Sequence, residues 1–141
     1  MINAVAPAIM LSQLAPLLTP QWSADNDQID AIDALSMGHS FVVNVTSHEG
    51  QFCTSGKTDH HIHTNISKAC LNMLTRTSSH YYAKMGILIN SVDTGWVSSA
   101  LPTFKEPPLT LQDATKRILH PILIGSFEYG KLYKNYKVVD W

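Results

Sequence analysis

The feature that most constrains the fold is a long helical pattern between two short, uncharged runs rich in β-branched residues. The runs are SFVVNVTS, residues 40–47, and ILINSV, residues 87–92. Between them, Asn65 to Lys84 place apolar side chains three and four residues apart, which predicts one long helix that stops before Gly86. Unbroken apolar strands joined by a helix indicate a parallel sheet with helices over its faces.

The segments on either side continue this alternation. Residues 2–18 carry apolar side chains at helical spacing, and residues 110–123 open with Thr110, a good N-cap residue, and should be helical until Pro121. The closing GKLYKNYKVVDW predicts a third strand over residues 130–136 and then a tail. The three strands should be parallel neighbours, with the first helix and the long helix on one side of them.

The 141 residues suggest one domain. Within it, residues 20–40 predict a polar loop with a short helix near Asp30–Leu35, and the prolines of residues 101–109 predict an extended loop. A net charge of −1 does not favour binding to nucleic acid or to an anionic membrane. The apolar start is too short to span a bilayer, and two cysteines without CxxC spacing fit a reducing compartment, so we expect a cytoplasmic protein.

Three polar features are predicted to meet at one edge of the sheet. Ser47 ends the first strand, and Asp93–Gly95 follow the second. If the long helix begins near Thr64, then Thr64 and Lys68 share one face of it, because residues four apart are neighbours. Parallel sheets bind ligands at the carboxyl ends of their strands. A serine, a lysine and a polar turn could therefore converge in one crevice.

Four segments stand in a characteristic order: INAVAPAIMLSQLAPLL, FVVNVTSHEG, TNISKACLNMLTRT and YAKMGILINSVDTGWV. In this order they resemble the C-terminal half of the short-chain dehydrogenase/reductase family, over most of residues 2–100. The first resembles a helix with a catalytic asparagine, here Asn3. The second and third resemble the strand with the catalytic serine, here Ser47, and the helix with the catalytic lysine, here Lys68. The ending GKLYKNYKVVDW is similar to that of an atypical branch with His-Thr-Asn before the lysine helix.

The resemblance implies the C-terminal part of a Rossmann-type, doubly wound parallel sheet, and hydride transfer between NAD or NADP and a carbonyl or alcohol. The implied catalytic residues are Asn3, Ser47, Thr64 and Lys68. Lys68 would also bind the cofactor, together with the turn residues Asp93, Thr94, Gly95, Trp96 and Val97. Helices 3–18 and 65–84 would pack against a partner, which implies a homo-oligomer or a partner protein, and the small-molecule substrate stays open.

Two departures from the family pattern matter. Thr64 stands at the position of the family's catalytic tyrosine, and a threonine hydroxyl is a far weaker acid than a phenol. The glycine-rich dinucleotide fingerprint is missing, because no three of the seven glycines lie close enough together. We therefore expect the dinucleotide-binding half to be absent, and the function to be either a truncated or degenerate oxidoreductase or a non-catalytic fragment with an interaction surface.

Plainer structural interpretations stay open. Lys68 could reach water past a core helix, Ser47 could cap a turn, and Thr64 could be the N-cap of the long helix.

The sequence DHHIH, residues 59–63, has imidazoles that suit zinc, but a loop does not fix three or four ligands, so we expect no metal. His60 or His63 could instead replace the missing phenol as proton donor. Cys70, on the apolar helix face, is expected in the core.

Overall fold

The computed structural model describes residues 2–20, 38–55, 57–98 and 105–141. At its centre is one sheet made of β1 (Ser40–Thr46), β2 (Ile87–Asp93), β3 (Leu132–Lys134) and β4 (Lys137–Val139), in that order. β1 pairs with β2 and β2 with β3 in parallel, whereas β4 is antiparallel to β3. The predicted parallel neighbours are confirmed.

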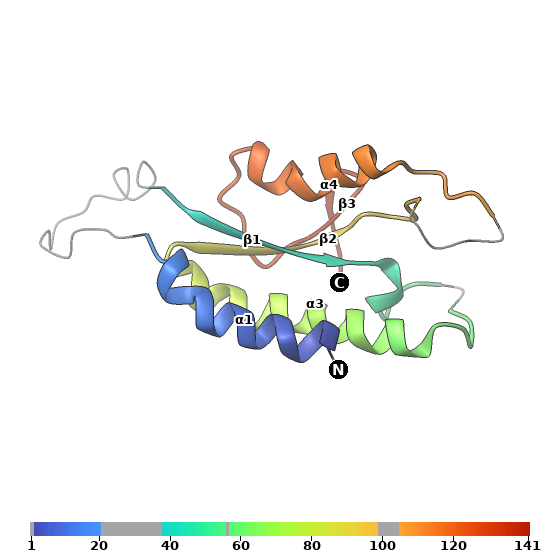
Figure 1. Ribbon diagram of the computed structural model, residues 1–141, viewed down its shortest axis with the longest axis horizontal. Helices are drawn as coiled ribbons and strands as arrows, with labels where there is room; N and C mark the ends of the chain where they lie inside the picture. Colours follow the sequence, from blue (N-terminus) through green and yellow to red (C-terminus); the bar gives the residue numbers. More distant parts are fainter. Residues whose placement is uncertain (1, 21–37, 56, 99–104) are drawn as a thin grey trace, which may run out of the picture.

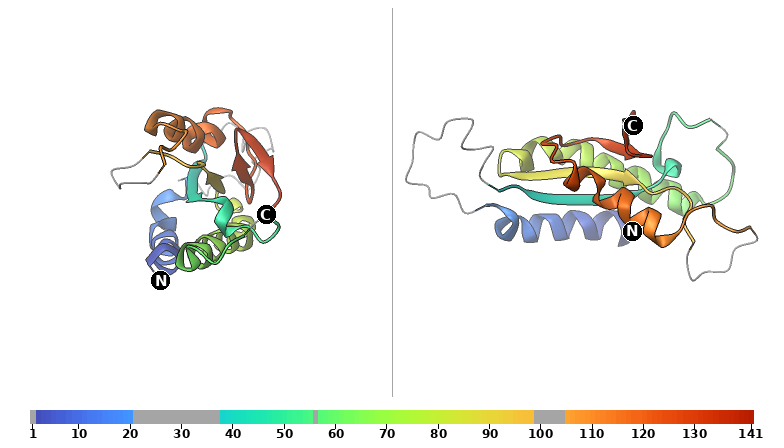
Figure 2. Two further views of the ribbon diagram at one scale, coloured as in Figure 1. Left: turned by 90° about the vertical axis from the view of Figure 1, so that its right-hand side faces the viewer. Right: turned by 90° about the horizontal axis from the view of Figure 1, so that it is seen from above.

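Helices cover both faces of this sheet (Figure 1). α1 (Ile2–Leu18) and α3 (Ile62–Ala83) pack side by side on one face, as predicted, and α4 (Leu111–Leu123) lies over the opposite face. The views of Figure 2 show the same three layers. The short helix η1 (His48–Gly50) follows β1 and packs against α3.

The core lies between the sheet and the two helices α1 and α3. All seven residues of β2 are buried, as expected for a strand that is covered on both faces. Leu11 and Ala15 of α1 pack against Ile87 and Ile89 of this strand. The continuous apolar run of β2 is therefore explained by its central position in the sheet.

The start of α3 differs from the prediction. The helix begins at Ile62 rather than Asn65, after His61, which has a φ of 57° and is the N-cap residue without a side-chain cap. The interpretation of Thr64 as the N-cap is wrong, because Thr64 lies inside the first turn. A left-handed histidine carries no capping signal, so sequence reasoning placed the boundary too late.

The start of α4 is as predicted, and its end is not. The Thr110 hydroxyl accepts the Asp113 N–H at 3.2 Å, and the Asp113 carboxylate accepts the Thr110 N–H at 2.9 Å, which makes a capping box. The helix then continues past Pro121 to Leu123. A proline in the last turn removes one backbone hydrogen bond, which is not enough to end the helix there.

The predicted third strand, residues 130–136, and its tail instead form a hairpin. β3 covers only three residues, and the chain turns through Asn135 and Tyr136, which have φ values of 49° and 65°. Two residues with positive φ match the tight turn of a type I′ hairpin. Tyr136 stands where glycine is usual, so no local signal indicated the turn.

Two other expectations have different outcomes. The short helix near Asp30–Leu35 lies outside the described residues. Cys70 is exposed rather than in the core, because the apolar face of α3 is wider than the surface that the sheet and α1 cover.

In the described part of the chain, every helix is too short or too polar to cross a membrane.

Candidate functional site

The carboxyl ends of the three parallel strands meet in one row. The register places Thr46 beside Asp93, and Asp93 beside Lys134. The Lys134 ammonium lies 3.4 Å from Asp93 Oδ2, and Asp93 is only 1% exposed. A partly exposed cation thus lies over a buried carboxylate, at the edge where parallel sheets bind ligands.

α3 directs Lys68 toward the end of β1. Its Nζ donates a hydrogen bond to the Val45 carbonyl oxygen at 2.8 Å. Partial burial lowers the pKa of Lys68 from its ordinary value of 10.5, because the charged form loses hydration. The ammonium therefore contacts the strand that leads into Ser47, instead of reaching away from the sheet into water.

Ser47 presents an unused hydroxyl. It is the N-cap residue of η1, but its side chain makes no capping hydrogen bond, so the turn-cap interpretation is wrong. The Ser47 Oγ atom is buried and has no hydrogen-bond partner among the described residues. Thr64 is partly buried and lies one helical turn before Lys68, so both residues are on one face of α3, as predicted.

Asn3 is on α1, the helix beside α3. It is exposed in the first turn of α1 and borders a hollow of about 380 Å³ together with His63 and Ser67 of α3. Within the described chain, no hydrogen bond joins Asn3 to Ser47 or Lys68. The structure therefore brings together the serine strand and the lysine helix, and places the asparagine at the junction of α1 and α3.

The turn after β2 is braced from two directions. Asp93 Oδ1 accepts the Gly95 N–H at 2.8 Å, and Arg117 Nη1 of α4 donates to the Thr94 carbonyl oxygen at 2.9 Å. Gly95 has a φ of 76°, and a Cβ there would lie 2.9 Å from Arg117 Nη1. The positive φ therefore favours glycine, while the two close atoms, at the ends of the flexible Leu109 and Arg117 side chains, could shift.

The rest of the turn faces outward or onto a neighbouring segment. Trp96 is 48% exposed, and Val97 forms a parallel bridge with Leu109. Sequence reasoning missed Arg117, which no motif distinguishes from the adjacent Lys116. Its contact with Thr94 exists only because α4 packs over the sheet.

Buried polar atoms without a hydrogen bond gather at this edge of the sheet, one of them in the ion pair between Asp93 and Lys134. Five buried side-chain polar atoms in the described residues have no hydrogen-bond partner, and four of them are Thr46 Oγ1, Ser47 Oγ, Asp93 Oδ2 and Arg117 Nε. Buried polar atoms are normally paired, so such a concentration is unusual. Together with the Lys68 and Lys134 ammonium groups, the Thr46 and Ser47 hydroxyls and Arg117 Nε could donate hydrogen bonds to a polar, electron-rich ligand, whereas Asp93 Oδ2 can only accept.

The histidine-rich segment does not form a metal centre in this structure. The His60 ring lies 3.8 Å from the Asp59 carboxylate, and both side chains are exposed. Over the described ranges, no three potential ligand side chains come together in a way that could hold a metal ion.

The chain is similar to a known protein in sequence and to solved structures in fold. No family model matches the chain. The uncharacterized protein R665 of Acanthamoeba polyphaga mimivirus is 34% identical over an alignment of 112 residues, and the match covers 70% of this chain and 24% of the relative.

Solved carbonyl reductases share the fold. Carbonyl reductase Sniffer of D. melanogaster has a TM-score of 0.72 at 22% identity, covering 99% of this chain and 54% of its own. The NADPH-bound carbonyl reductase from chicken fatty liver has a TM-score of 0.63 at 21% identity, with the same coverage. A structure described as a putative short-chain dehydrogenase/reductase from Burkholderia multivorans with bound NADP has a TM-score of 0.65 at 16% identity, covering 99% of this chain and 52% of its own.

The chain spans about half the length of these structures and about a quarter of the curated relative. At these identities the structural likeness concerns the fold. The chain has an α/β fold with a mostly parallel four-stranded sheet and flanking helices, and it matches half of a Rossmann-type short-chain dehydrogenase/reductase structure.

Proposed function

We propose that this chain forms the substrate-side, C-terminal half of an NAD- or NADP-dependent carbonyl reductase of the short-chain dehydrogenase/reductase type. The observation that carries the proposal is the hydrogen bond from the Lys68 ammonium to Val45, near the end of β1. Val45 is two residues before Ser47, whose buried hydroxyl has no hydrogen-bond partner among the described residues. The fold shared with carbonyl reductases supports it. Because the chain spans about half of those structures, the activity is proposed for a completed protein.

Each residue has a defined task in this proposal. When bound, the dinucleotide supplies the hydride that reduces the carbonyl carbon. Ser47 Oγ would hold the substrate oxygen by a hydrogen bond, Lys68 would hold the nicotinamide ribose, and the turn of residues 93–97 would hold the carboxamide. Thr64 can hydrogen-bond to the substrate oxygen, but its hydroxyl is a poor proton donor compared with a phenol, and His63 beside it is the alternative donor.

The residues present fit only the nicotinamide end of the cofactor. The Ser47 hydroxyl and the Lys68 ammonium suit a carboxamide, a ribose or a carbonyl, whereas the glycine-rich turn that would receive the pyrophosphate is not in the sequence. A few hydrogen bonds of about 1 kcal/mol each do not offset the cost of immobilising a flexible dinucleotide. The isolated chain should therefore bind NADH or NADPH weakly.

The test is a fluorescence titration of NADPH with the isolated chain, and with the chain completed by a dinucleotide-binding half, either fused or supplied in trans. We expect weak binding by the chain alone and restored binding in the completed protein. Thr64→Tyr in that protein should raise carbonyl reduction, and Lys68→Met should lower it. Micromolar binding by the chain alone, or no binding after completion, would contradict the proposal.

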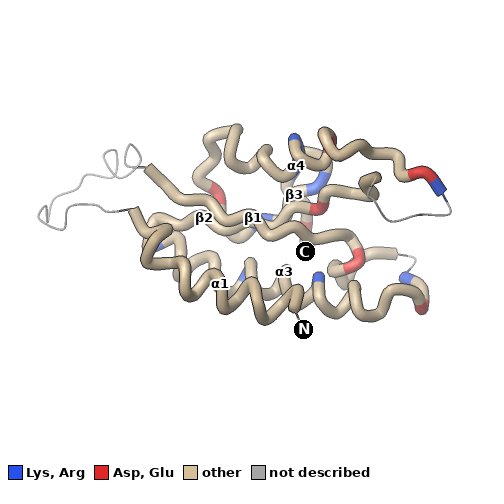
Figure 3. Tube along the Cα trace, in the orientation of Figure 1, with Lys and Arg blue, Asp and Glu red and all other residues tan. Residues whose placement is uncertain are grey.

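The second candidate function is a non-catalytic interaction module. α1 has no charged residue, and Ile2, Ile9 and Leu17 are more than half exposed. Figure 3 shows this helix without acidic or basic positions along its length. An apolar exposed helix beside α3 suits a partner protein or a second copy, whether or not the chain takes part in catalysis.

A further inference from the structure

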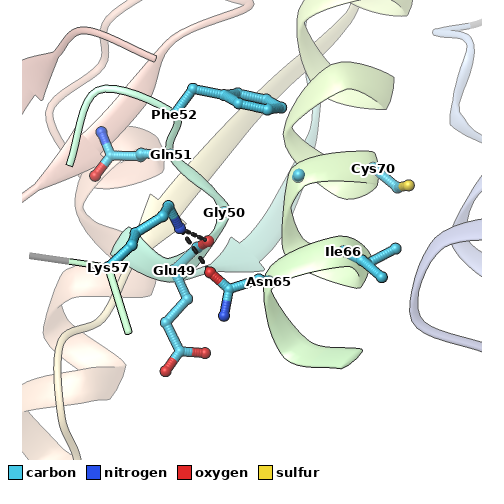
Figure 4. A pocket seen from close by; sticks show the side chains of 9 residues that line it. Glu49, Gly50, Gln51, Phe52, Lys57, Asn65, Ile66 and Cys70 are labelled. Carbon is cyan, nitrogen blue, oxygen red and sulfur yellow. Dashed lines mark hydrogen bonds between the residues drawn. The ribbon is translucent and has the colours of Figure 1, made fainter. Parts of the chain in front are cut away.

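A mainly apolar hollow of about 410 Å³ lies over the first turns of α3 (Figure 4). Phe52 lines it from the segment after η1, and Ile66, Ala69 and Cys70 line it from α3. This volume is in the range of small-molecule sites, which are mostly apolar with a few polar groups. None of the residues proposed for the reductase site lines this hollow.

A second hollow of about 100 Å³ adjoins the first and is lined by polar groups. Glu49, Lys57 and Asn65 line both hollows, so the two are neighbours. The remaining lining residues of the smaller hollow carry imidazoles or hydroxyls, namely His48, Thr54, Ser55, Thr58, His60 and His61. The histidine-rich segment thus contributes hydrogen-bonding groups to this small hollow.

Lys57 stands where the two hollows meet. Its Nζ donates to the Glu49 carbonyl oxygen and to Asn65 Oδ1, each at 2.6 Å (Figure 4). Both acceptors are uncharged, and the ion pairs of the described residues do not include Lys57. The Glu49 carboxylate extends away from the ammonium in Figure 4. Since an ammonium has three donors, one stays available to a ligand.

We propose that the two hollows form one binding site for a small amphipathic carboxylate. The carboxylate lies at Lys57 and the polar hollow, and an aliphatic body lies along the apolar hollow. The fixed cation selects the charge, and the apolar walls select the body, because burial of the methylene groups is favourable. This site is separate from the reductase proposal and does not depend on it.

Octanoate is the probe, and its binding to the whole chain is measured by two-dimensional NMR titration. We expect binding that Lys57→Met weakens at least about tenfold. Ala69→Phe should abolish it by filling the apolar hollow, and Glu49→Gln should tighten it by removing a nearby negative charge. Lys116→Met, at an exposed lysine of α4, is the matched control and should leave the affinity unchanged.

Cys70 reports on the site without any substitution, which keeps the test valid if Lys57→Met disturbs the loop. Octanoate should slow alkylation of Cys70, whereas Cys53, which lines neither hollow, should react at an unchanged rate. Equal protection by uncharged 1-octanol would overturn the proposal, because the surface would then be an apolar docking face. Absence of protection by millimolar octanoate, or equal affinity in Lys57→Met, would overturn it as well.

Discussion

The Lys68 ammonium and the Val45 carbonyl oxygen lie 2.8 Å apart and join α3 to β1. β1 pairs only with β2 among the described strands, so the lysine binds a strand at the edge of this sheet. A surface lysine would keep its charge fully hydrated, whereas this one is partly buried against the backbone. That difference leads to the first prediction.

Lys68 should have a pKa below the ordinary lysine value of 10.5, because desolvation disfavours its charged form. The unfolded chain then binds the proton more strongly, so stability should rise with pH between the folded and unfolded pKa values. NMR titration of the side-chain Cε and Nζ resonances measures this pKa. A Lys68 titration at or above 10.5 would contradict the assignment.

Thr75→Val should destabilise the fold although the two side chains are similar in size. Thr75 Oγ1 is fully buried and accepts hydrogen bonds from Asn44 Nδ2 and Ser91 Oγ, each at 2.8 Å. The valine would leave both donors unpaired, and we expect a loss of about 2 kcal/mol or more in urea denaturation. Thr77→Val, at an exposed position of the same helix, should change stability by less than about 0.5 kcal/mol. Equal effects would contradict the role of this network.

Gly50→Ala should also destabilise the fold. An added Cβ would lie 2.6 Å from the Lys68 carbonyl carbon and 2.9 Å from the Ala69 nitrogen, and backbone atoms cannot move aside easily. We expect a loss of about 1–3 kcal/mol, measured by thermal or urea denaturation. Gly38→Ala is the matched control, since a Cβ there meets no atom within 4 Å. A neutral Gly50→Ala would show that η1 does not pack against α3 as described.

Tyr133 should ionise only at an unusually high pH. Burial and the hydrogen bond of its hydroxyl to Glu128 Oε2, at 2.9 Å, raise its pKa to about 12. The unfolded chain loses this proton near pH 10, so the contribution of Tyr133 to stability is complete below pH 10 and is lost between pH 10 and about 12. Ultraviolet titration at the tyrosinate band should show an ionisation step near pH 12 that Tyr133→Phe removes. Tyr81→Phe, at an exposed position, should leave that step in place.

The isolated chain should associate through α1 and α3. Ile9 and Met73, from these two helices, border one shallow hollow and are 56% and 57% exposed. Ile9→Glu should weaken self-association at least about tenfold in sedimentation experiments, because a charge would have to be buried. Leu111→Glu on α4, where the leucine is 68% exposed, should have no effect. A compact monomer at high concentration would contradict self-association and favour a different partner.

The elements that the sequence predicted well are those whose signal is local. β1 and β2 were found within one residue at each end, and Thr110 is the N-cap of α4 as expected. The errors lie where a local signal was missing or misleading. His61 begins a helix in a left-handed conformation, and Tyr136 makes a tight turn without glycine. Cys70 shows a further limit, since a helical pattern defines an apolar face but not what covers it.

The sequence by itself determined the alternation of strands and helices, and with it a parallel sheet, because side-chain periodicity follows from the backbone geometry of each element. Only the tertiary structure decided which polar groups meet at the carboxyl edge. Arg117 reaches the Thr94 carbonyl and Lys134 reaches Asp93 across separate elements, and neither pair has a sequence signature. Such contacts depend on how whole helices and strands pack, which no local pattern specifies.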